Sequence, residues 1–261
     1  MKNTFHLYLR SKNKSCKPLK EIILPKRVIY RMGSTTPTNQ ITKFNVTLEI
    51  NSPEACKVSG NKLLMKKHFE VGNIRTAPWF TINKEDVNGE RIKHYLEEWD
   101  KIIVKHKNSS HGQGIYLLEC FENYVELIDE IGLNNIKNYI FERYYTYVKE
   151  YRIHLNEDGY FYASRKMLLK DAEDRWHRHA NNSVFIGENN ELFDRPANWD
   201  EIVEECQNAR KAVGLDFVAF DIKVNKKGDF IILESNSAPA LGEQGIQIYK
   251  DELIRYINER I

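Results

Sequence analysis

Strand-forming residues dominate the chain from residue 138 onward. The runs NYIFERYY, KEYRIHL, GYFYASRKMLL and NSVFI are rich in aromatic and β-branched residues, which favour strands. Two further apolar runs, FVAF and FIIL, flank the turn-forming cluster Asn225-Lys226-Lys227-Gly228, so residues 217–241 are predicted to form a hairpin. The second half of the chain is therefore predicted to contain a central antiparallel sheet.

Helical spacing of apolar residues marks several other segments. Apolar or small residues recur at helical intervals over 198–213, and Gly214 is well placed to end that helix. Pro53 suits the first turn of a helix predicted over 52–69. The remaining predicted elements are helices over 90–100, 121–131 and the C-terminal GIQIYKDELIRYINERI, and strands at 20–31, KIIVKH and IYLLE. This order predicts an α/β start followed by an α+β region.

Composition limits the classes of function. The chain has 261 residues, 41% of them hydrophobic and 29% charged, which is typical of a globular protein with a substantial core. The net charge of +2 does not indicate binding to nucleic acid, although a local contact stays open. No signal peptide or membrane-spanning run is visible. Four widely separated cysteines predict reduced thiols and a cytoplasmic location: Cys16, Cys56, Cys120 and Cys206.

The predicted hairpin carries three oxygen-bearing side chains near its open end. Asp221 lies on the first strand, and Glu234 and Asn236 lie on the second, where their spacing of two puts them on one face. Two carboxylates and an amide form an incomplete set of ligands that suits Mg²⁺, which takes its other ligands from water and nucleotide phosphates. The alternative is an ordinary hairpin with polar residues at its solvated end. The neighbouring apolar runs favour the metal, because buried carboxylates need a counter-charge.

A lysine and a small glycine-containing loop precede the β-rich region. Lys105 ends a predicted strand and is followed by the loop Asn108–Gly114. Glycines let backbone N–H groups approach phosphates, and the ammonium neutralises their charge. Lys62 is a second candidate for phosphate binding. A plain hairpin turn and an exposed helical lysine are the respective alternatives.

Charged residues also lie on the predicted strands that follow. Glu142 and Glu150 are candidates for binding an adenine amine and ribose hydroxyls, the alternative being cross-strand salt bridges with Arg143, Arg152 or Lys149. Arg152 alternates with apolar neighbours and is therefore expected to face away from them. Further cations that suit phosphate or carboxylate recognition are Arg165, Lys166, Arg175 and Arg178.

Taken in order, these motifs resemble the ATP-grasp superfamily of carboxylate–amine ligases. The resemblance covers about residues 50–245 and rests on Asn61-Lys62-Leu63, IIVKHKNSSHGQGI, FERYYTYVKEYRIHL and Asp221 with Glu234-Ser-Asn236-Ser-Ala-Pro239. The chain is most similar to small ATP-grasp proteins of bacteriophages, and more distantly to ribosomal-protein glutamate ligases and D-alanine:D-alanine ligases. Two departures are His106, where the family has proline, and Met32-Gly33, where it has a Trp-Gly motif.

The resemblance implies a fold and a division of the chain. The expected fold is α+β, an ATP-grasp fold in which two α+β lobes clasp ATP after a short α/β N-terminal segment. The N-terminal segment would span 1–50, the small lobe with its preceding helix 51–140, and the large lobe with the Mg²⁺ and ATP site 141–261. Whether the loop Arg31–Thr35 contacts substrate is left open by the departure at Met32.

The resemblance also implies roles for individual residues. Lys62 and Lys105 would contact the phosphates, and the loop would close over them through Ser109, Ser110, Gly112 and Gly114. Glu142 and Tyr144 would meet the adenine and Glu150 the ribose. The Mg²⁺ ligands would be Asp221, Glu234 and Asn236, and the catalytic cations near the transferred phosphate would be Arg152, Lys166 and Arg178. Residues 240–245 are expected to line the acceptor pocket.

The implied reaction needs no protein nucleophile. ATP would phosphorylate a carboxylate, and an amine would displace the phosphate, so positioning and charge neutralisation carry the chemistry. The acid and amine would be small molecules or peptides, with a modified nucleobase also open as acceptor, and a homodimer is compatible with the sequence. Two alternatives are a phosphotransferase on the same fold and a non-catalytic nucleotide-binding regulator.

Overall fold

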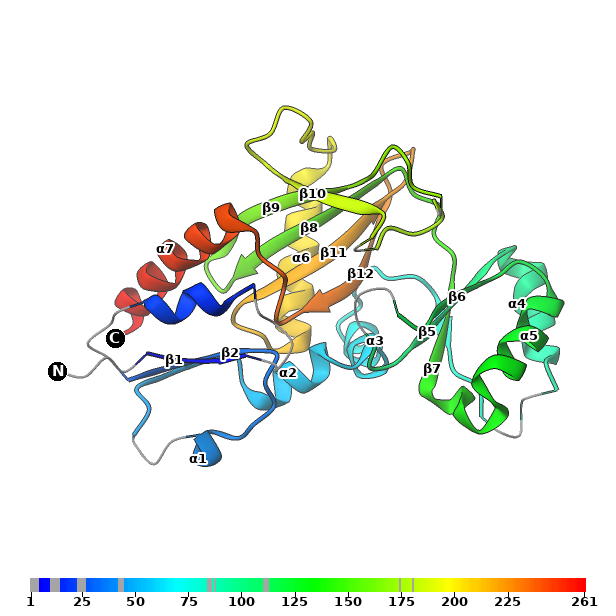
Figure 1. Cartoon of the computed structure of the whole chain (residues 1–261), viewed down its shortest axis with the longest axis horizontal. Coiled ribbons are helices and arrows are strands. Elements are labelled where there is room, and N and C mark those ends of the chain that lie inside the picture. The colour runs from blue at the N-terminus through cyan, green and yellow to red at the C-terminus, as the bar shows by residue number, and fades with distance from the viewer. Residues whose placement is uncertain are drawn as a thin grey trace.

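The protein combines three β-sheets with helices that pack against their faces (Figure 1). The computed structural model describes residues 5–9 by backbone alone, and 15–22, 27–41, 45–83, 86, 88–109, 113–173, 175–179 and 181–261 in full. Within this part of the chain the strands group as three, four and five. The mixed architecture confirms the predicted α+β class.

The five-stranded sheet contains the predicted β-rich region and is antiparallel throughout. The hairpin predicted over 217–241 is confirmed as its last two strands, with a bulge after Asp221. The strand order is β10 (Ser183–Gly187), β9 (Gly159–Leu168), β8 (Lys149–Asn156), β11 (Val218–Val224) and β12 (Phe230–Asn236).

The four-stranded sheet lies at the right end of the molecule in Figure 1, beyond the five-stranded sheet, and is also antiparallel. Two amphipathic helices, α4 (Glu90–Trp99) and α5 (Phe121–Ile131), pack on one of its faces through Trp99 and Leu127. A 3-10 helix follows at Leu133–Asn138. The strand order is β4 (Trp79–Phe80), β7 (Tyr139–Arg143), β5 (Ile102–His106) and β6 (Ile115–Leu118).

The three-stranded sheet is parallel and comes from the N-terminal region. Its strands are β1 (Phe5–Leu9), β2 (Val28–Met32) and β3 (Leu48–Ile50), with a 3-10 helix at Lys17–Glu21 and the short helix α1 at Thr38–Ile41. The C-terminal helix α7 (Glu243–Arg260) packs in the same core through Tyr249 and Leu253. The strand predicted over 20–31 is correct only from Val28, since a 3-10 turn occupies its start and 23–26 lie outside the described residues.

One predicted helix proves to be two. In place of a single helix over 52–69, α2 (Pro53–Ser59) ends at Gly60, and α3 (Lys62–Val71) begins after Asn61. The Asn61 side chain accepts a hydrogen bond from the Leu64 amide (3.0 Å) and so caps the second helix, which explains the break. The prediction of one helix was wrong because the helical spacing of apolar residues continues across residues 60 and 61. The backbone nevertheless leaves the helix there, where Asn61 caps the start of α3.

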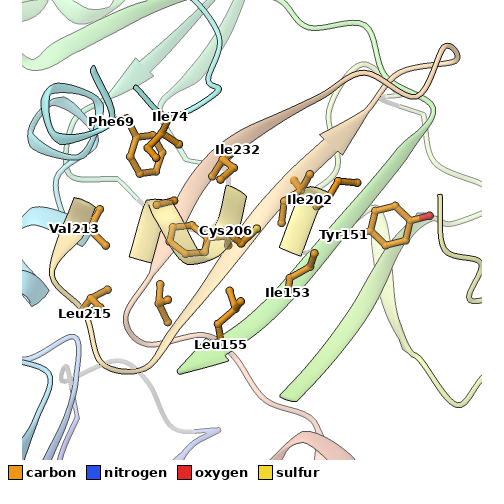
Figure 2. Packing of buried hydrophobic residues seen from close by; sticks show 14 of the residues in the cluster. Phe69, Ile74, Tyr151, Ile153, Leu155, Ile202, Cys206, Val213, Leu215 and Ile232 are labelled. Atoms are coloured by element: carbon orange, nitrogen blue, oxygen red, sulfur yellow. The ribbon is translucent and has the colours of Figure 1, made fainter. Parts of the chain in front are cut away.

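The largest core lies between the five-stranded sheet and α6 (Trp199–Val213) (Figure 2). Tyr151, Ile153 and Leu155, which alternate along β8, point into this core beside Ile202 and Cys206 of α6. Helix α6 ends at Gly214 in the left-handed conformation (φ 73°), as predicted. No helix within the described residues is long and apolar enough to span a membrane.

Candidate active site

The five-stranded sheet buries charged side chains on the face opposite its apolar core. Strand β8 places Tyr151 and Ile153 in the core, so Glu150 and Arg152 point to the other side. Register then fixes their partners, because Arg152 lies directly opposite Asp221 of β11, and Glu150 lies opposite Lys223. Because side chains alternate along β8, one face of the strand packs in the apolar core and the other face carries the charged residues.

Arg152 and Asp221 form a bidentate ion pair at the centre of this face. The Arg152 Nε and Nη2 atoms donate to the two carboxylate oxygens at 2.6 and 2.8 Å. Asp221 is only 3% exposed. Burial raises the pKa of its carboxyl, but the charge and hydrogen bonds of Arg152 outweigh that effect and leave the pKa below its usual value. The aspartate is thus held as an anion.

The other two predicted metal ligands lie on the adjoining strand. Glu234 is directly opposite Asp221 in the register of β11 and β12, and Asn236 follows two residues later on the same face. The structure therefore brings the side chains of all three predicted ligands to one face and one end of the hairpin.

The chemistry of this set fits Mg²⁺. Asp221 uses one lone pair of each carboxylate oxygen for Arg152 and retains others. The buried Nδ2 atom of Asn236 has no hydrogen-bond partner within the described residues, and rotating the amide by half a turn would put its oxygen in that position. No group of three or more His, Cys, Asp or Glu side chains suited to a metal occurs in the described part of the chain. The predicted set has only two such side chains, Asp221 and Glu234, and its third ligand is the amide of Asn236.

Glu150 lies near two lysines, the half-buried Lys166 and the buried Lys223. Its carboxylate lies 3.2 Å from the Lys166 ammonium, while the Oε2 atom finds no hydrogen bond among the described residues. The Lys223 ammonium lies 3.9 Å from the centre of the Tyr147 ring. Burial lowers the pKa of Lys223 to about 8, although the charge of Glu150 opposes this shift.

Glu142 is the corresponding acid of the four-stranded sheet. It pairs with Lys105 of β5 at 2.8 Å and with Lys66 of α3 at 3.4 Å. Burial raises the pKa of Glu142, but the two ammonium charges outweigh it and lower the pKa overall. Lys66 is fully buried, which lowers its pKa to about 8, and it also donates to the Thr76 hydroxyl at 2.6 Å.

The two sets of charges belong to one cluster. The pKa of Lys223 on the five-stranded sheet is affected by the charges of Lys105 and Glu142 on the four-stranded sheet, as well as by the charge of Glu150. The charged cluster, as we use the term, consists of Lys66, Lys105, Glu142, Glu150, Arg152, Lys166, Asp221, Lys223 and Glu234.

The start of α3 is bonded to the predicted phosphate loop. The Lys62 Nζ donates to the Ser109 carbonyl at 2.5 Å. The side-chain Nδ2 of Asn61 donates to the side-chain Oδ1 of Asn108 at 2.9 Å. Gly114 adopts a positive φ of 61° where the loop rejoins β6, and an added Cβ would lie 3.1 Å from that of His106. The predicted residues Ser110 and Gly112 lie outside the described part of the chain.

Arg178 lies beside the charged cluster on the segment before β10. Its Nη2 donates to the Val148 carbonyl at 3.1 Å, its guanidinium stands 4.8 Å from the centre of the Tyr147 ring, and its own carbonyl accepts a 2.5 Å hydrogen bond from Lys166. The buried Nε and Nη1 atoms have no hydrogen-bond partner among the described residues. Such donors suit an anionic ligand. Nearby, the Tyr144 hydroxyl donates to the Trp176 carbonyl.

The sequence missed two members of the charged cluster. Lys66 follows Lys62 by four residues, the spacing of one helical face, and Lys223 follows Asp221 by two, the spacing of one strand face. Both signals were available, but lysines are usually exposed. The alternative partners of Glu142 and Glu150 proposed from the sequence are not the ones that form the ion pairs, since lysines from other strands and from α3 fill that role.

Open surface cavities lie elsewhere. One, of about 290 Å³, is lined by residues of the 169–182 segment, and another, of about 450 Å³, adjoins the 227–230 turn. Neither has a lining residue from the charged cluster. Most members of the cluster are buried, while Arg152, Lys166 and Glu234 are half-buried.

Comparisons with known proteins identify the class of fold. No protein-family model and no curated protein matches the chain. Among solved structures, D-alanyl-alanine synthetase A from Vibrio cholerae matches 89% of this chain and 76% of its own length, with 13% identity and a TM-score of 0.68. D-alanine–D-alanine ligase from Bacillus anthracis, complexed with ATP, matches 97% and 92%, with 12% identity and a TM-score of 0.67.

A peptide-bound enzyme shares the same architecture. The ATP-grasp ligase PsnB, complexed with a phosphomimetic variant of its minimal precursor, Mg and ADP, matches 80% of this chain with 18% identity and a TM-score of 0.59. This chain spans about 62% of the length of that protein. The protein therefore has the ATP-grasp fold, as the resemblance implied.

Proposed function

We propose that the protein is an ATP- and Mg²⁺-dependent ligase that joins a carboxylate to an amine and releases ADP and phosphate. The observation that carries this proposal is the bidentate Arg152–Asp221 pair, with Glu234 directly opposite and Asn236 at the strand end, on the charged face of an ATP-grasp fold. Burying acids and cations of this kind destabilises the folded state, and such groups cluster at functional sites.

The nucleotide would be held between the two sheets that contribute to the charged cluster. Lys62 and Lys105 are proposed to bind its phosphates, because one is bonded to the loop backbone and the other is buried beside it. The remaining proposed contacts are Ser109, Ser110, Gly112 and Gly114 of the loop, Glu142 and Tyr144 for the base, and Glu150 for the ribose. The unpaired Oε2 of Glu150 supports its role, since a ribose hydroxyl could donate to it.

Asp221, Glu234 and Asn236 would hold Mg²⁺. Bound there, the metal would screen the charge of the phosphates and so favour transfer of the terminal phosphoryl group. Arg152 would keep Asp221 ionised and oriented at the same time, which is the role of an outer partner of a metal ligand.

Cations would stabilise the reacting phosphate. The carboxylate oxygen of the acid substrate would attack the terminal phosphorus as the bond to ADP breaks. The amine nitrogen would then attack the acyl carbon, phosphate would leave, and the amine would lose a proton. Arg152, Lys166 and Arg178 are proposed to neutralise the negative charge that builds up on the phosphate oxygens. The two unpaired N–H groups of Arg178 support that assignment.

The acceptor side is proposed from residues 240–245, which follow Asn236 closely. Gln244 reaches the edge strand β10, where a Cβ on Gly187 would lie only 2.7 Å from its Oε1. The solved relatives include a ligase with a precursor peptide and ligases named for D-alanine, so amino acids and peptides are the substrates to test first. The cytoplasmic location, a homodimer and the division into 1–50, 51–140 and 141–261 stay predictions from the sequence.

A substrate screen tests the reaction. Purified protein with Mg²⁺ and ATP is combined with pooled carboxylates and amines, and ADP release is measured. We expect ADP release that requires both an acid and an amine, and loss of at least 99% of it in Asp221→Asn, with Glu252→Gln on α7 as control. A stable phosphorylated product without amine would replace the ligase with a phosphotransferase. Failure to bind ATP at all would contradict both.

A further inference from the structure

The residues on either side of Asn236 are held by one serine of another element. Ser59, the last residue of α2, is 8% exposed and lies against the end of β12. Its hydroxyl donates to the Ser235 carbonyl at 3.1 Å. It accepts from the Ser235 hydroxyl at 3.1 Å and from the Ser237 amide at 3.2 Å.

These three bonds use the whole capacity of the hydroxyl. A serine hydroxyl has one donor and two acceptor lone pairs, and here each has a partner from residue 235 or 237. The backbone of Asn236 is therefore fixed from both sides by a single atom. A second contact, from the Ser235 amide to the Met65 sulfur at 3.2 Å, ties the same segment to α3.

The side chain of Asn236 has little else to orient it. Its Nδ2 atom makes no hydrogen bond to the described residues, so the position of the amide depends on the backbone of β12, which pairs with β11 at Ala219 and is held on either side of Asn236 by Ser59. We propose that Ser59 is a positioning residue for the metal site, which holds the end of β12 so that Asn236 would be presented to Mg²⁺. This inference rests on the proposed function, because it assigns Asn236 to the metal.

Binding of Mg²⁺ is sensitive to the position of each ligand. The ion accepts only near-octahedral geometry with short ligand distances, so a ligand displaced by a fraction of an ångström binds poorly. Loss of an outer partner of a metal ligand commonly weakens metal binding by about tenfold to a hundredfold. Ser59 touches neither metal nor substrate, and its effect should appear in metal affinity before anything else.

The experiment measures metal binding directly, without turnover. Mn²⁺ is titrated into the full-length protein with saturating ADP, and free Mn²⁺ is quantified by electron paramagnetic resonance. We expect Ser59→Ala to raise the dissociation constant of Mn²⁺ by about tenfold, with ADP affinity in the absence of metal unchanged. Ser59→Thr, which keeps the hydroxyl, should restore most of the affinity.

Two further variants separate the possible failures. Ser52→Ala removes the other hydroxyl of α2, which caps the helix by accepting from the Ala55 amide, and should lower the melting temperature without changing Mn²⁺ affinity. Asn236→Ala should weaken Mn²⁺ binding at least as much as Ser59→Ala. If Asn236→Ala weakens binding and Ser59→Ala does not, the positioning role is wrong and the metal site stands. If Asn236→Ala has no effect either, the metal assignment itself fails.

Should Ser59→Ala prove too unstable to purify, Ser235→Ala offers a milder change. It removes the hydroxyl that donates to Ser59 and leaves the other two bonds in place. We then expect a smaller but measurable rise in the Mn²⁺ dissociation constant, and an unchanged constant would overturn the role of Ser59.

Discussion

The two antiparallel sheets bury charge in different ways. On the five-stranded sheet Asp221 and Arg152 face each other across neighbouring strands, so the sheet's own register sets their geometry. On the four-stranded sheet Glu142 takes one lysine from the next strand and a second, Lys66, from α3. Because α3 packs in the core of the five-stranded sheet through Met65 and Phe69, this second pair joins the two units.

Ion pairs formed within one sheet are thus distinct from ion pairs that hold the two sheets together. A pair formed within one sheet persists as long as that sheet is folded. A pair formed across two packing units also depends on how the units sit against each other. Substitutions can separate these cases because the two kinds of pair have well-matched controls.

The largest effect is expected from Glu142→Gln. The substitution keeps the shape of the side chain but leaves the buried ammonium groups of Lys66 and Lys105 without their counter-charge. We expect it to lower the free energy of unfolding by about 3 kcal/mol, measured by urea denaturation at pH 7. Adding Lys66→Met should recover part of this loss, since one uncompensated cation is then removed.

The matched control for this change is Glu119→Gln. Glu119, just after β6, pairs with Lys101, just before β5, but both side chains are well exposed, so the expected change is below about 1 kcal/mol. Equal losses in the two variants would mean that burial does not distinguish these pairs.

A medium effect, opposite in sign, is expected from Lys223→Met. Burial lowers the pKa of Lys223 to about 8 in the folded protein, against a usual value of 10.5. At pH 7 the lysine is protonated in both states, and the folded state is destabilised by the buried charge. We expect the variant to be more stable than the parent by about 2–3 kcal/mol at that pH.

The pH dependence of this gain follows from linkage. Between pH 8 and 10.5 the unfolded parent chain holds a proton that the folded chain has lost, so the stability of the parent rises with pH. The advantage of Lys223→Met should therefore shrink from pH 8 and vanish near pH 10.5 in urea denaturation. Lys226→Met, at an exposed turn position, should show no such trend, and a constant advantage at all pH values would contradict the assignment.

The smallest effect concerns the connection between the sheets. Tyr145 lies between β7 and β8, and its hydroxyl donates to the Asp229 carbonyl at the hairpin turn (2.7 Å). Tyr145→Phe should cost about 1 kcal/mol or less and speed amide hydrogen exchange near the turn of β11 and β12. Tyr116→Phe removes a hydroxyl bonded to Glu130 within the other unit and should leave that exchange unchanged.

Elements with strong periodicity were predictable from the sequence. The hairpin over 217–241, helix α6 with Gly214 at its end, and helix α5 all appear as expected, because each combines a clear pattern with a turn or cap signal. The break between α2 and α3 was not predicted, since the capping role of Asn61 outweighs an uninterrupted apolar spacing. Local signals compete, and the sequence alone does not rank them.

The sequence predicted which residues would face the site better than it predicted which acid would pair with which cation. Two-residue spacing placed Glu234 and Asn236 on one face and Arg152 away from its apolar neighbours. Which cation meets which acid depended on strand order and on a helix reaching across to another sheet, and neither can be derived from spacing along one strand. Lys66 illustrates this best, because its partner Glu142 lies 76 positions further along the chain, on another packing unit.

The break between α2 and α3 also brings two structural contacts close together along the chain. Ser59, before the break, holds the end of β12, while Lys62, after it, holds the carbonyl of Ser109 in the phosphate loop. Only three chain steps separate these residues, at most about 10 Å of extended backbone. One short stretch of backbone therefore connects the contact to the phosphate loop with the contact to the Asn236 end of β12.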